Sequence, residues 1–195
     1  MSNFFVHETS IIDAGAKIGK DTKIWHFSHI MSKAVIGERC NIGQNVYIDN
    51  NVKIGAGVKI QNNVSVYANV EVEDDCFLGP SMVFTNVVNP RAFVERKNEF
   101  KNTLVKRGCS IGANATIICG ITLGEYSFVG AGTLVNKDIP PYAMVVGVPM
   151  RTIGWISKNG QKLSFNEDGI GICSITKEKY KLIGESKVIC LEDEK

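Results

Sequence analysis

Several features that point to common classes of protein are scarce in this sequence. Only three histidines occur, and the six cysteines show no C-x-x-C spacing, so a zinc site is not indicated. No apolar run approaches the roughly 18 residues of a membrane span. The first residues, MSNFFVHETS, contain neither a basic segment nor a long apolar stretch, so we expect no secretory signal. The predicted protein is reduced, soluble and cytoplasmic, with no membrane partner.

Charge and aromatic content are also low. The net charge is +2 and no basic stripe is present, which argues against nucleic acid as a partner. Aromatic residues make up 8% of the 195 residues while 19 are glycine, a composition that favours tight repeated corners over a bulky globular centre. The length fits one domain with a small appendage.

An apolar residue returns at every sixth position between residues 12 and 84. The positions are Ile12, Ile18, Ile24, Ile30, Ile36, Ile42, Ile48, Ile54, Ile60, Val66, Val72, Leu78 and Phe84. Neither a helix nor an isolated strand has this period, whereas a short self-similar repeat indicates a solenoid. Hexads of the form Ile-Gly-x-x-Val-x, three to a turn, predict an all-β fold, a parallel β-helix over residues 12–140. Residues 1–11 would cap its open end through Phe4 and Phe5.

The rhythm breaks after Phe84 and resumes at Val105, 21 residues later, so about 15 residues are inserted into the coil. We expect this insertion to leave the prism as a loop over about residues 90–104, and long loops in compact domains are usually functional or disordered. Residues 141–158 then leave the repeat as an exit segment. Residues 159–195 contain GIGICS and KYKLI, whose alternation predicts a small hairpin cap.

Positions 18 residues apart should stack at about 4.8 Å, the spacing of neighbouring strands. The hexads that begin at residues 24, 42, 60 and 78 contain no Asp, Glu, Lys or Arg, whereas those at 18, 36, 54 and 72 are rich in charge. A charge-free face predicts a subunit contact or a groove for a neutral ligand. The alternative is a ladder of asparagines that only satisfies the backbone of the turns.

Several segments resemble those of one enzyme family. They are IWHFSHI, GQNVYI, KIQNNVSVY, GPSMVFTNVVNPRA, ERKNEFKNTLVKRG, IGANATIICGITLGEYSFVGAGTLV and YAMVVGVPMRTIGW. Together they are similar to the left-handed β-helix (hexapeptide-repeat) acyltransferases. In particular they resemble amino-sugar N-acetyltransferases that act on the 3-amino group of UDP-2-acetamido-3-amino-2,3-dideoxy-glucuronate, for bacterial surface polysaccharide (O-antigen). The resemblance implies a left-handed coil, acetyl-CoA as co-substrate with no metal, and a homotrimer with active sites between subunits.

The resemblance also implies that acetyl-CoA lies along the C-terminal coils and the nucleotide sugar along the coils below. Asn86, in the last coil before the insertion, would then be the catalytic residue that orients the acceptor amine. An amide cannot act as a base, but a sugar amine loses its proton near neutrality, so a strong general base is less necessary than for a hydroxyl. The competing interpretation is an asparagine that merely turns a corner.

The other candidate site residues rest on the same resemblance and on the ladder. Substrate-binding candidates are His26, His29, Gln44, Asn62, Asn63, Tyr67, Arg91 and Lys97, of which the loop cations suit a diphosphate and a uronate. Cofactor-binding candidates are Asn114, Ile118, Gly130, Ala131, Lys137, Val148, Pro149 and Arg151. Small residues near position 130 would let the pantetheine arm approach the backbone. Packing alone is the alternative for the histidines and the glycines.

Other functions remain open at this point. The same fold could acetylate a dTDP-3-amino-3,6-dideoxyhexose, whose methyl group would need no cation near C6. A non-catalytic trimeric scaffold would keep the coil and bind no CoA. A β-helical zinc hydratase would need about three converging histidines, and His26 and His29 have no third on a neighbouring coil.

Overall fold

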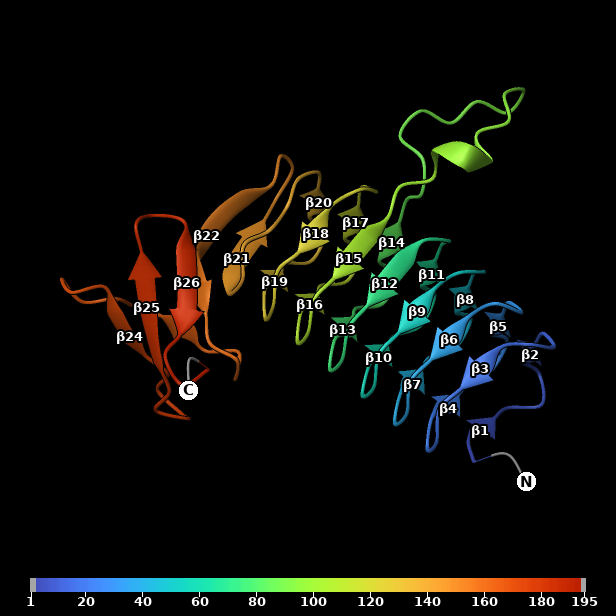
Figure 1. Ribbon diagram of the computed structural model, residues 1–195, viewed down its shortest axis with the longest axis horizontal. Coiled ribbons are helices and arrows are strands. Elements are labelled where there is room, and N and C mark those ends of the chain that lie inside the picture. Colours follow the sequence, from blue (N-terminus) through green and yellow to red (C-terminus); the bar gives the residue numbers. More distant parts are fainter. Residues whose placement is uncertain (1–2, 194–195) are drawn as a thin grey trace.

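The computed structural model describes residues 3–193 as a parallel β-helix of about eight coils, followed by a small antiparallel sheet (Figure 1). Each coil contributes one strand to each of three parallel sheets, here named A, B and C. The predicted all-β solenoid with three repeats per turn is confirmed. No helix in the described part of the chain is both long enough and apolar enough to cross a membrane.

The strands of the coil are short, most of them two residues long. The parallel part of sheet A consists of β1 (Phe5–Val6), β4 (Lys23–Ile24), β7 (Asn41–Ile42), β10 (Lys59–Ile60), β13 (Phe77–Leu78), β16 (Ser110–Ile111), β19 (Phe128–Val129) and β21 (Ala143–Val146). Sheet B consists of β2 (Ile11–Ile12), β5 (His29–Ile30), β8 (Tyr47–Ile48), β11 (Ser65–Val66), β14 (Val83–Phe84), β17 (Thr116–Ile117) and β20 (Leu134–Val135). Sheet C consists of β3 (Lys17–Ile18), β6 (Val35–Ile36), β9 (Lys53–Ile54), β12 (Val70–Val72), β15 (Thr103–Val105) and β18 (Thr122–Leu123).

The repeating apolar residues form a continuous core inside the prism. From Ile24 to Phe84 they are at most 3% exposed, so each contributes roughly 1.5–3 kcal/mol of burial. The smaller residue four positions later also points inward. Where it is polar it bonds the next coil: the Thr22 hydroxyl donates to the Gly37 carbonyl at 2.8 Å and accepts from the Cys40 backbone nitrogen at 3.0 Å. The core is therefore a stack of nearly identical layers.

Tight corners join the strands, and most of them contain a residue in the left-handed backbone region. Between sheets A and B this residue is Phe27, Asn45, Asn63, Ser81 and Asn114 in successive coils, with φ between 56° and 61°. Asparagine adopts this conformation more readily than most residues with a side chain. Part of the asparagine ladder seen in the sequence therefore reflects corner geometry.

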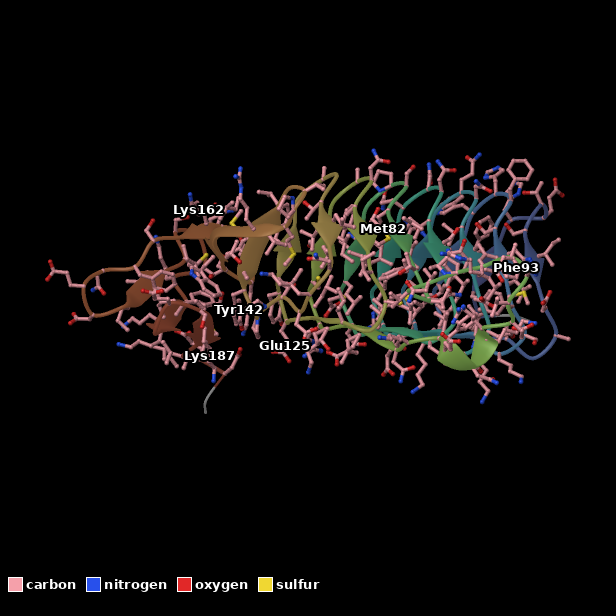
Figure 2. All side chains as sticks on the ribbon, turned by 90° about the horizontal axis from the view of Figure 1, so that it is seen from above. Met82, Phe93, Glu125, Tyr142, Lys162 and Lys187 are labelled. Carbon is pink, nitrogen blue, oxygen red and sulfur yellow. The ribbon has the colours of Figure 1, made fainter. Side chains whose placement is uncertain are left out.

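The insertion interrupts the coil without changing its register. Phe77 pairs with Ser110, 33 positions later, which is one 18-residue coil plus the predicted 15 inserted residues. The chain leaves after β14 and returns at β15, at the corner between sheets B and C, and contains one turn of 3-10 helix, η1 (Lys97–Glu99). The inserted loop projects from the prism and leans toward the N-terminal coils (Figures 1 and 2).

The coil begins earlier than the six-residue period indicates. β1 already pairs with β4, which places Phe5 opposite Lys23 on the outer side of sheet A, where Phe5 is 46% exposed. Phe5 therefore does not cover the open end of the core, contrary to the expectation of a cap. Phe4 is half-buried beside it.

The C-terminal part is a small sheet assembly. After β21 the chain reverses into β22 (Arg151–Ile156), which is antiparallel to β21, and continues to β23 (Lys162–Leu163). The last strands, β24 (Ile170–Ile172), β25 (Lys179–Ile183) and β26 (Lys187–Cys190), form a separate antiparallel sheet rather than the single hairpin expected. Buried residues of this sheet, including Tyr180, join the main core.

Candidate functional site

The uncharged residues identified in the sequence form one surface. In each two-residue strand of the coil the second residue, which is apolar, points inward and the first points outward. Each charge-free hexad therefore covers the corner between sheets A and B and one outward position of sheet B. We call this surface the charge-free strip. It has no Asp, Glu, Lys or Arg over six successive coils, and it is formed by the outward-facing members of residues 25–29, 43–47, 61–65, 79–83, 112–116 and 130–134. The strip extends beyond the insertion, into the coils expected to bind CoA.

The stacking predicted for the corner side of the strip is confirmed. Backbone bonds of 2.9–3.0 Å join Asn45 to His26, Asn63 to Gln44 and Ser81 to Asn62. The Oδ1 atom of Asn62 accepts from the backbone nitrogen of Gln44 at 2.9 Å, so this amide serves the turn. Gln44 itself is exposed. A groove of about 370 Å³ lies along this corner, with Trp25, His26, Gln44 and Asn62 among its walls.

The two central histidines occupy different parts of the strip. His26 lies at the corner, where its ring stacks on His7 with centroids 3.5 Å apart, so a third histidine does lie on the neighbouring coil, contrary to the expectation from the sequence. His29 points outward from sheet B, and its Nε2 lies 3.0 Å from Oδ1 of Asp13. The two rings therefore lie on different parts of the strip, although they are only three residues apart in the sequence. His29 also makes an edge contact with Tyr47, at 6.0 Å between centroids.

Tyr47 was not among the site residues predicted from the sequence, but it lies at the centre of this part of the surface. It lies between His29 and Tyr67, with ring centroids 6.1 Å apart in the second pair. Burial and the neighbouring carboxylate of Asp49 raise the pKa of Tyr47, so its hydroxyl stays protonated. Its position 18 residues after His29 is the signal that could have identified it.

Asn86 lies at the neck of the inserted loop. Its carbonyl oxygen accepts from the backbone nitrogen of Lys101 at 3.0 Å, which brings the two ends of the loop together. The hydroxyls of Thr85 and Thr103 accept from the backbone nitrogens of Cys119 and Gly120, at 2.9 and 3.1 Å, and fasten both ends to the next coil. The half-buried side-chain amide of Asn86 has no hydrogen-bond partner within residues 3–193. It is thus available to a ligand at a fixed point.

Of the loop cations, Arg91 and Lys97 are exposed and Arg96 is half-buried. Arg91 donates to the carbonyl of Pro90 at 3.1 Å, and the ammonium of Lys97 lies 3.6 Å from Glu95. Arg96 holds both carboxylate oxygens of Glu99 at 2.8 Å. These contacts shape the loop itself. Arg91 and Lys97 could still meet an anion at the loop surface.

Five of the eight residues predicted to bind CoA gather at the C-terminal end of the strip. The backbone nitrogen of Gly147 donates to the Thr133 hydroxyl at 3.2 Å, and that of Leu134 donates to the Gly147 carbonyl at 3.3 Å. The turn of the β21–β22 hairpin, with the exposed Val148, Pro149 and the nearby Arg151, is thereby held beside the corner of Gly130 and Ala131. We call residues 147–150 the hairpin turn.

Small residues leave the backbone beside this turn open. A Cβ atom added to Gly132 would meet nothing within 4 Å, whereas one added to Gly130 would lie 2.7 Å from Val146. Ala131 and Gly132 are exposed. This surface fits an extended chain that must approach the backbone closely, as a pantetheine arm does.

The other three CoA candidates are divided between the two sides of sheet B. Asn114 lies on the corner between sheets A and B and is exposed, and its backbone nitrogen bonds the Pro80 carbonyl. Ile118 and Lys137 follow β17 and β20 on the opposite side of sheet B, one and two coils above Asn86. Within residues 3–193, no three or more His, Cys, Asp or Glu side chains are placed to hold a metal.

Comparisons with known proteins agree with this architecture. Residues 15–50 match the family profile of the bacterial transferase hexapeptide (six repeats), and residues 42–140 match that of the GMPPB C-terminal domain. The chain is 44% identical over 177 residues to the dTDP-3-amino-3,6-dideoxy-alpha-D-galactopyranose 3-N-acetyltransferase of Aneurinibacillus thermoaerophilus. That alignment covers 91% of this chain and 90% of the relative. The chain belongs to the hexapeptide-repeat acyltransferases.

Solved structures of hexapeptide-repeat acyltransferases also resemble this chain. A galactoside acetyltransferase in complex with coenzyme A superimposes with a TM-score of 0.58 and 26% identity, covering 72% of each chain. A hexapeptide-repeat acetyltransferase from Vibrio cholerae, complexed with acetyl coenzyme A, superimposes with a TM-score of 0.56 and 25% identity. The match covers 63% of this chain and 70% of that one. These similarities make this chain an enzyme of the acyltransferase class.

Proposed function

We propose that this hexapeptide-repeat acyltransferase transfers the acetyl group of acetyl-CoA to the 3-amino group of a dTDP-3-amino-3,6-dideoxyhexose. The observation that carries the proposal is the 44% identity, over nine-tenths of both chains, to an enzyme named for that reaction on the galactose isomer. The complexes of related structures with CoA and acetyl-CoA support the choice of donor. This acceptor is the alternative of the sequence analysis, and it has more support than the UDP-linked uronate.

The electrostatics of the strip also favour a sugar without a carboxylate. Over six coils the strip offers no cation to a uronate. The loop cations Arg91 and Lys97 lie outside the strip, on the inserted loop, where they contact the Pro90 carbonyl and Glu95. A 6-deoxy sugar has a methyl group at C6 in place of the carboxylate, so it needs no cation beside it.

In the proposed complex Asn86 orients the acceptor amine. Its amide lies at a point fixed by the loop neck and by Thr85, so it can direct the amine without moving. The amine nitrogen attacks the thioester carbonyl carbon, the carbon–sulfur bond breaks, and CoA leaves as a thiolate. The nitrogen then loses its proton to that thiolate or to water.

The rest of the strip would hold the two substrates end to end. His29 lies three ladder steps below Val83, or roughly 14 Å at 4.8 Å per coil, which suits the nucleotide end of the sugar. His26, Gln44, Asn62 and Asn63 would contact the nucleotide from the corner and Tyr67 the sugar. Gly130, Ala131, Asn114, Ile118 and Lys137 would receive CoA, with Val148, Pro149 and Arg151 at its nucleotide end.

We further propose that the enzyme is a homotrimer with active sites between subunits. The strip is wide and uncharged, whereas the outward residues of sheet A include Lys23 and Lys59. A second chain against the strip would exclude water from the groove. The loop, with Phe93 88% exposed, would extend across to that neighbour with Arg91 and Lys97 near its diphosphate.

The test is release of free thiol from acetyl-CoA with two acceptors assayed in parallel. We expect turnover with dTDP-3-amino-3,6-dideoxygalactose and little with UDP-2-acetamido-3-amino-2,3-dideoxy-glucuronate. Turnover with the uronate alone would replace the acceptor and place a loop cation at C6. If neither acceptor is acetylated and calorimetry detects no binding of CoA, the proposed activity is wrong and the non-catalytic trimeric scaffold is favoured.

A further inference from the structure

The C-terminal sheet is connected to the last coils by a column of tyrosines. The ring of Tyr126, in the coil that contains β19, stacks on Tyr142 at 5.6 Å and 11°. Tyr142 in turn meets the edge of Tyr180, from β25, at 5.4 Å and 72°. Tyr142 and Tyr180 are at most 4% exposed. Figure 2 shows Tyr142 at the junction between the coil and the C-terminal sheet.

An ion pair lies along this column. The ammonium of Lys158 is 2.5 Å from Oδ1 of Asp193 and 5.5 Å from the centre of the Tyr126 ring. The hydroxyl of Tyr142 donates to the other carboxylate oxygen of Asp193 at 3.4 Å, and the backbone nitrogen of Lys158 donates to the Tyr180 hydroxyl at 3.0 Å. We call Tyr142, Lys158 and Asp193 the tail lock.

The tail lock closes at the base of the β21–β22 hairpin. Tyr142 immediately precedes β21, and Lys158 follows β22 by two residues. The two ends of the hairpin are joined by a bond of 2.8 Å from the Ile156 nitrogen to the Tyr142 carbonyl. The opposite end is the hairpin turn, which bonds Thr133 and Leu134 beside the open backbone of the CoA surface.

Along the hairpin the pairing is interrupted. The register of β21 and β22 shifts between Met144 and Val145, so the ladder does not by itself hold the two strands in one continuous geometry. Arg151, Thr152 and Ile153 are exposed on β22. The orientation of the turn therefore depends on its own bonds to Thr133 and Leu134 and also on what fastens the base of the hairpin.

We propose that Lys158, Tyr142 and Asp193 are positioning residues for acetyl-CoA, through which the C-terminal tail holds the hairpin turn against the coil. The inference rests on the proposed function, because it assumes that acetyl-CoA contacts residues 147–151. The C-terminal tail would then contribute to the binding of acetyl-CoA but not to the binding of the amino sugar.

The experiment compares Lys158→Met and Asp193→Asn with Lys187→Ala, which changes an exposed lysine of β26 outside the lock. Calorimetry with acetyl-CoA and steady-state kinetics with both substrates are measured for each. We expect the Kd and KM for acetyl-CoA to rise about three- to fivefold in the two lock variants, the range of a partly exposed ion pair. The KM for the amino sugar, and kcat at saturating acetyl-CoA, should stay within twofold. Lys187→Ala should match the wild type.

Two further variants separate positioning from folding. Lys158→Arg keeps the cation and should restore most of the acetyl-CoA affinity, while Tyr142→Phe removes only one hydroxyl and should weaken it less than Lys158→Met. An unchanged acetyl-CoA Kd in folded Lys158→Met overturns the inference. An equal rise in both KM values also overturns it, since that is general loosening. If the wild type binds no acetyl-CoA, the proposed function fails first and is distinguished from either result.

Discussion

The carbonyl oxygen of Asn86 accepts from the backbone nitrogen of Lys101 at 3.0 Å, so the inserted loop starts and ends at one point on the coil. Because the repeat before and after this point is in register, the loop adds reach without disturbing the core. The Asn86 side chain is presented at the level where the charge-free strip passes from the lower coils to the coils next to the hairpin turn.

Replacing Asn86 by alanine should lower kcat by about 100-fold, the scale expected when a reacting group loses its precise position. The change removes no hydrogen bond to residues 3–193, so folding should be intact. Calorimetry should give an acetyl-CoA Kd within twofold of the wild type. Asn89→Ala, in the exposed part of the same loop, is the matched control. An unaltered kcat would remove Asn86 from the mechanism.

The stability of the coil should fall at alkaline pH because of its buried thiols. Burial raises the pKa of Cys109 to about 12, although the Ser127 hydroxyl at 3.3 Å opposes the shift. In the unfolded chain the Cys109 thiol has its ordinary pKa of about 9. Its contribution to the free energy of unfolding is therefore complete below pH 9 and is lost as the pH rises toward 12. This thiol should cost about 1.4 kcal/mol of unfolding free energy per pH unit in that window.

Urea unfolding at pH 8 and pH 10 tests this dependence. The free energy should fall between the two values in the wild type and fall less in Cys109→Ala. Cys76, whose pKa burial also raises, should account for part of the remainder. Equal losses in both proteins would mean that Cys109 ionises in the folded state as readily as in the unfolded one.

The register of the coil was predictable because one rule repeats along the whole chain. An apolar residue every six positions can be buried only if three hexads close a turn, and the 18-residue offset then determines each strand pair. The pairing of Phe77 with Ser110 follows from that offset and the length of the insertion alone. No long-range interaction had to be guessed.

The site was less predictable because some of its contacts do not follow the period. His29 bonds Asp13, 16 positions earlier, and His26 stacks on His7, 19 positions earlier, so neither pair is an 18-residue neighbour. Lys23 and Lys59 end the charged hexads that begin at residues 18 and 54, so the division into hexads did not show that both point outward from sheet A. The three-stranded tail sheet depends on packing against Tyr142, which no local pattern reveals.

A glycine prediction tests how tightly the coils stack. A Cβ atom at Gly37 would lie 2.6 Å from the backbone of Gly55 in the next coil, which cannot move independently. We expect Gly37→Ala to destabilise the fold by at least about 3 kcal/mol, the upper end of overpacking in a rigid core. Gly160→Ala meets nothing within 4 Å and should cost only about 1 kcal/mol, for its left-handed φ of 78°. Similar losses in chemical denaturation would argue against backbone contact as the cause.

The last prediction concerns the charge-free strip as a contact between copies of the chain. Ser65 and Ser110 are both half-buried and point outward from two-residue strands, but Ser65 belongs to sheet B and Ser110 to sheet A. A lysine at position 65 would place a charge in the proposed contact once per subunit, where desolvation opposes association. Light scattering should therefore report three chains for the wild type and for Ser110→Lys, and mostly single chains with little turnover for Ser65→Lys. A trimeric, active Ser65→Lys would move the subunit contact off the strip, since both variants carry the same added charge on equivalent backbone.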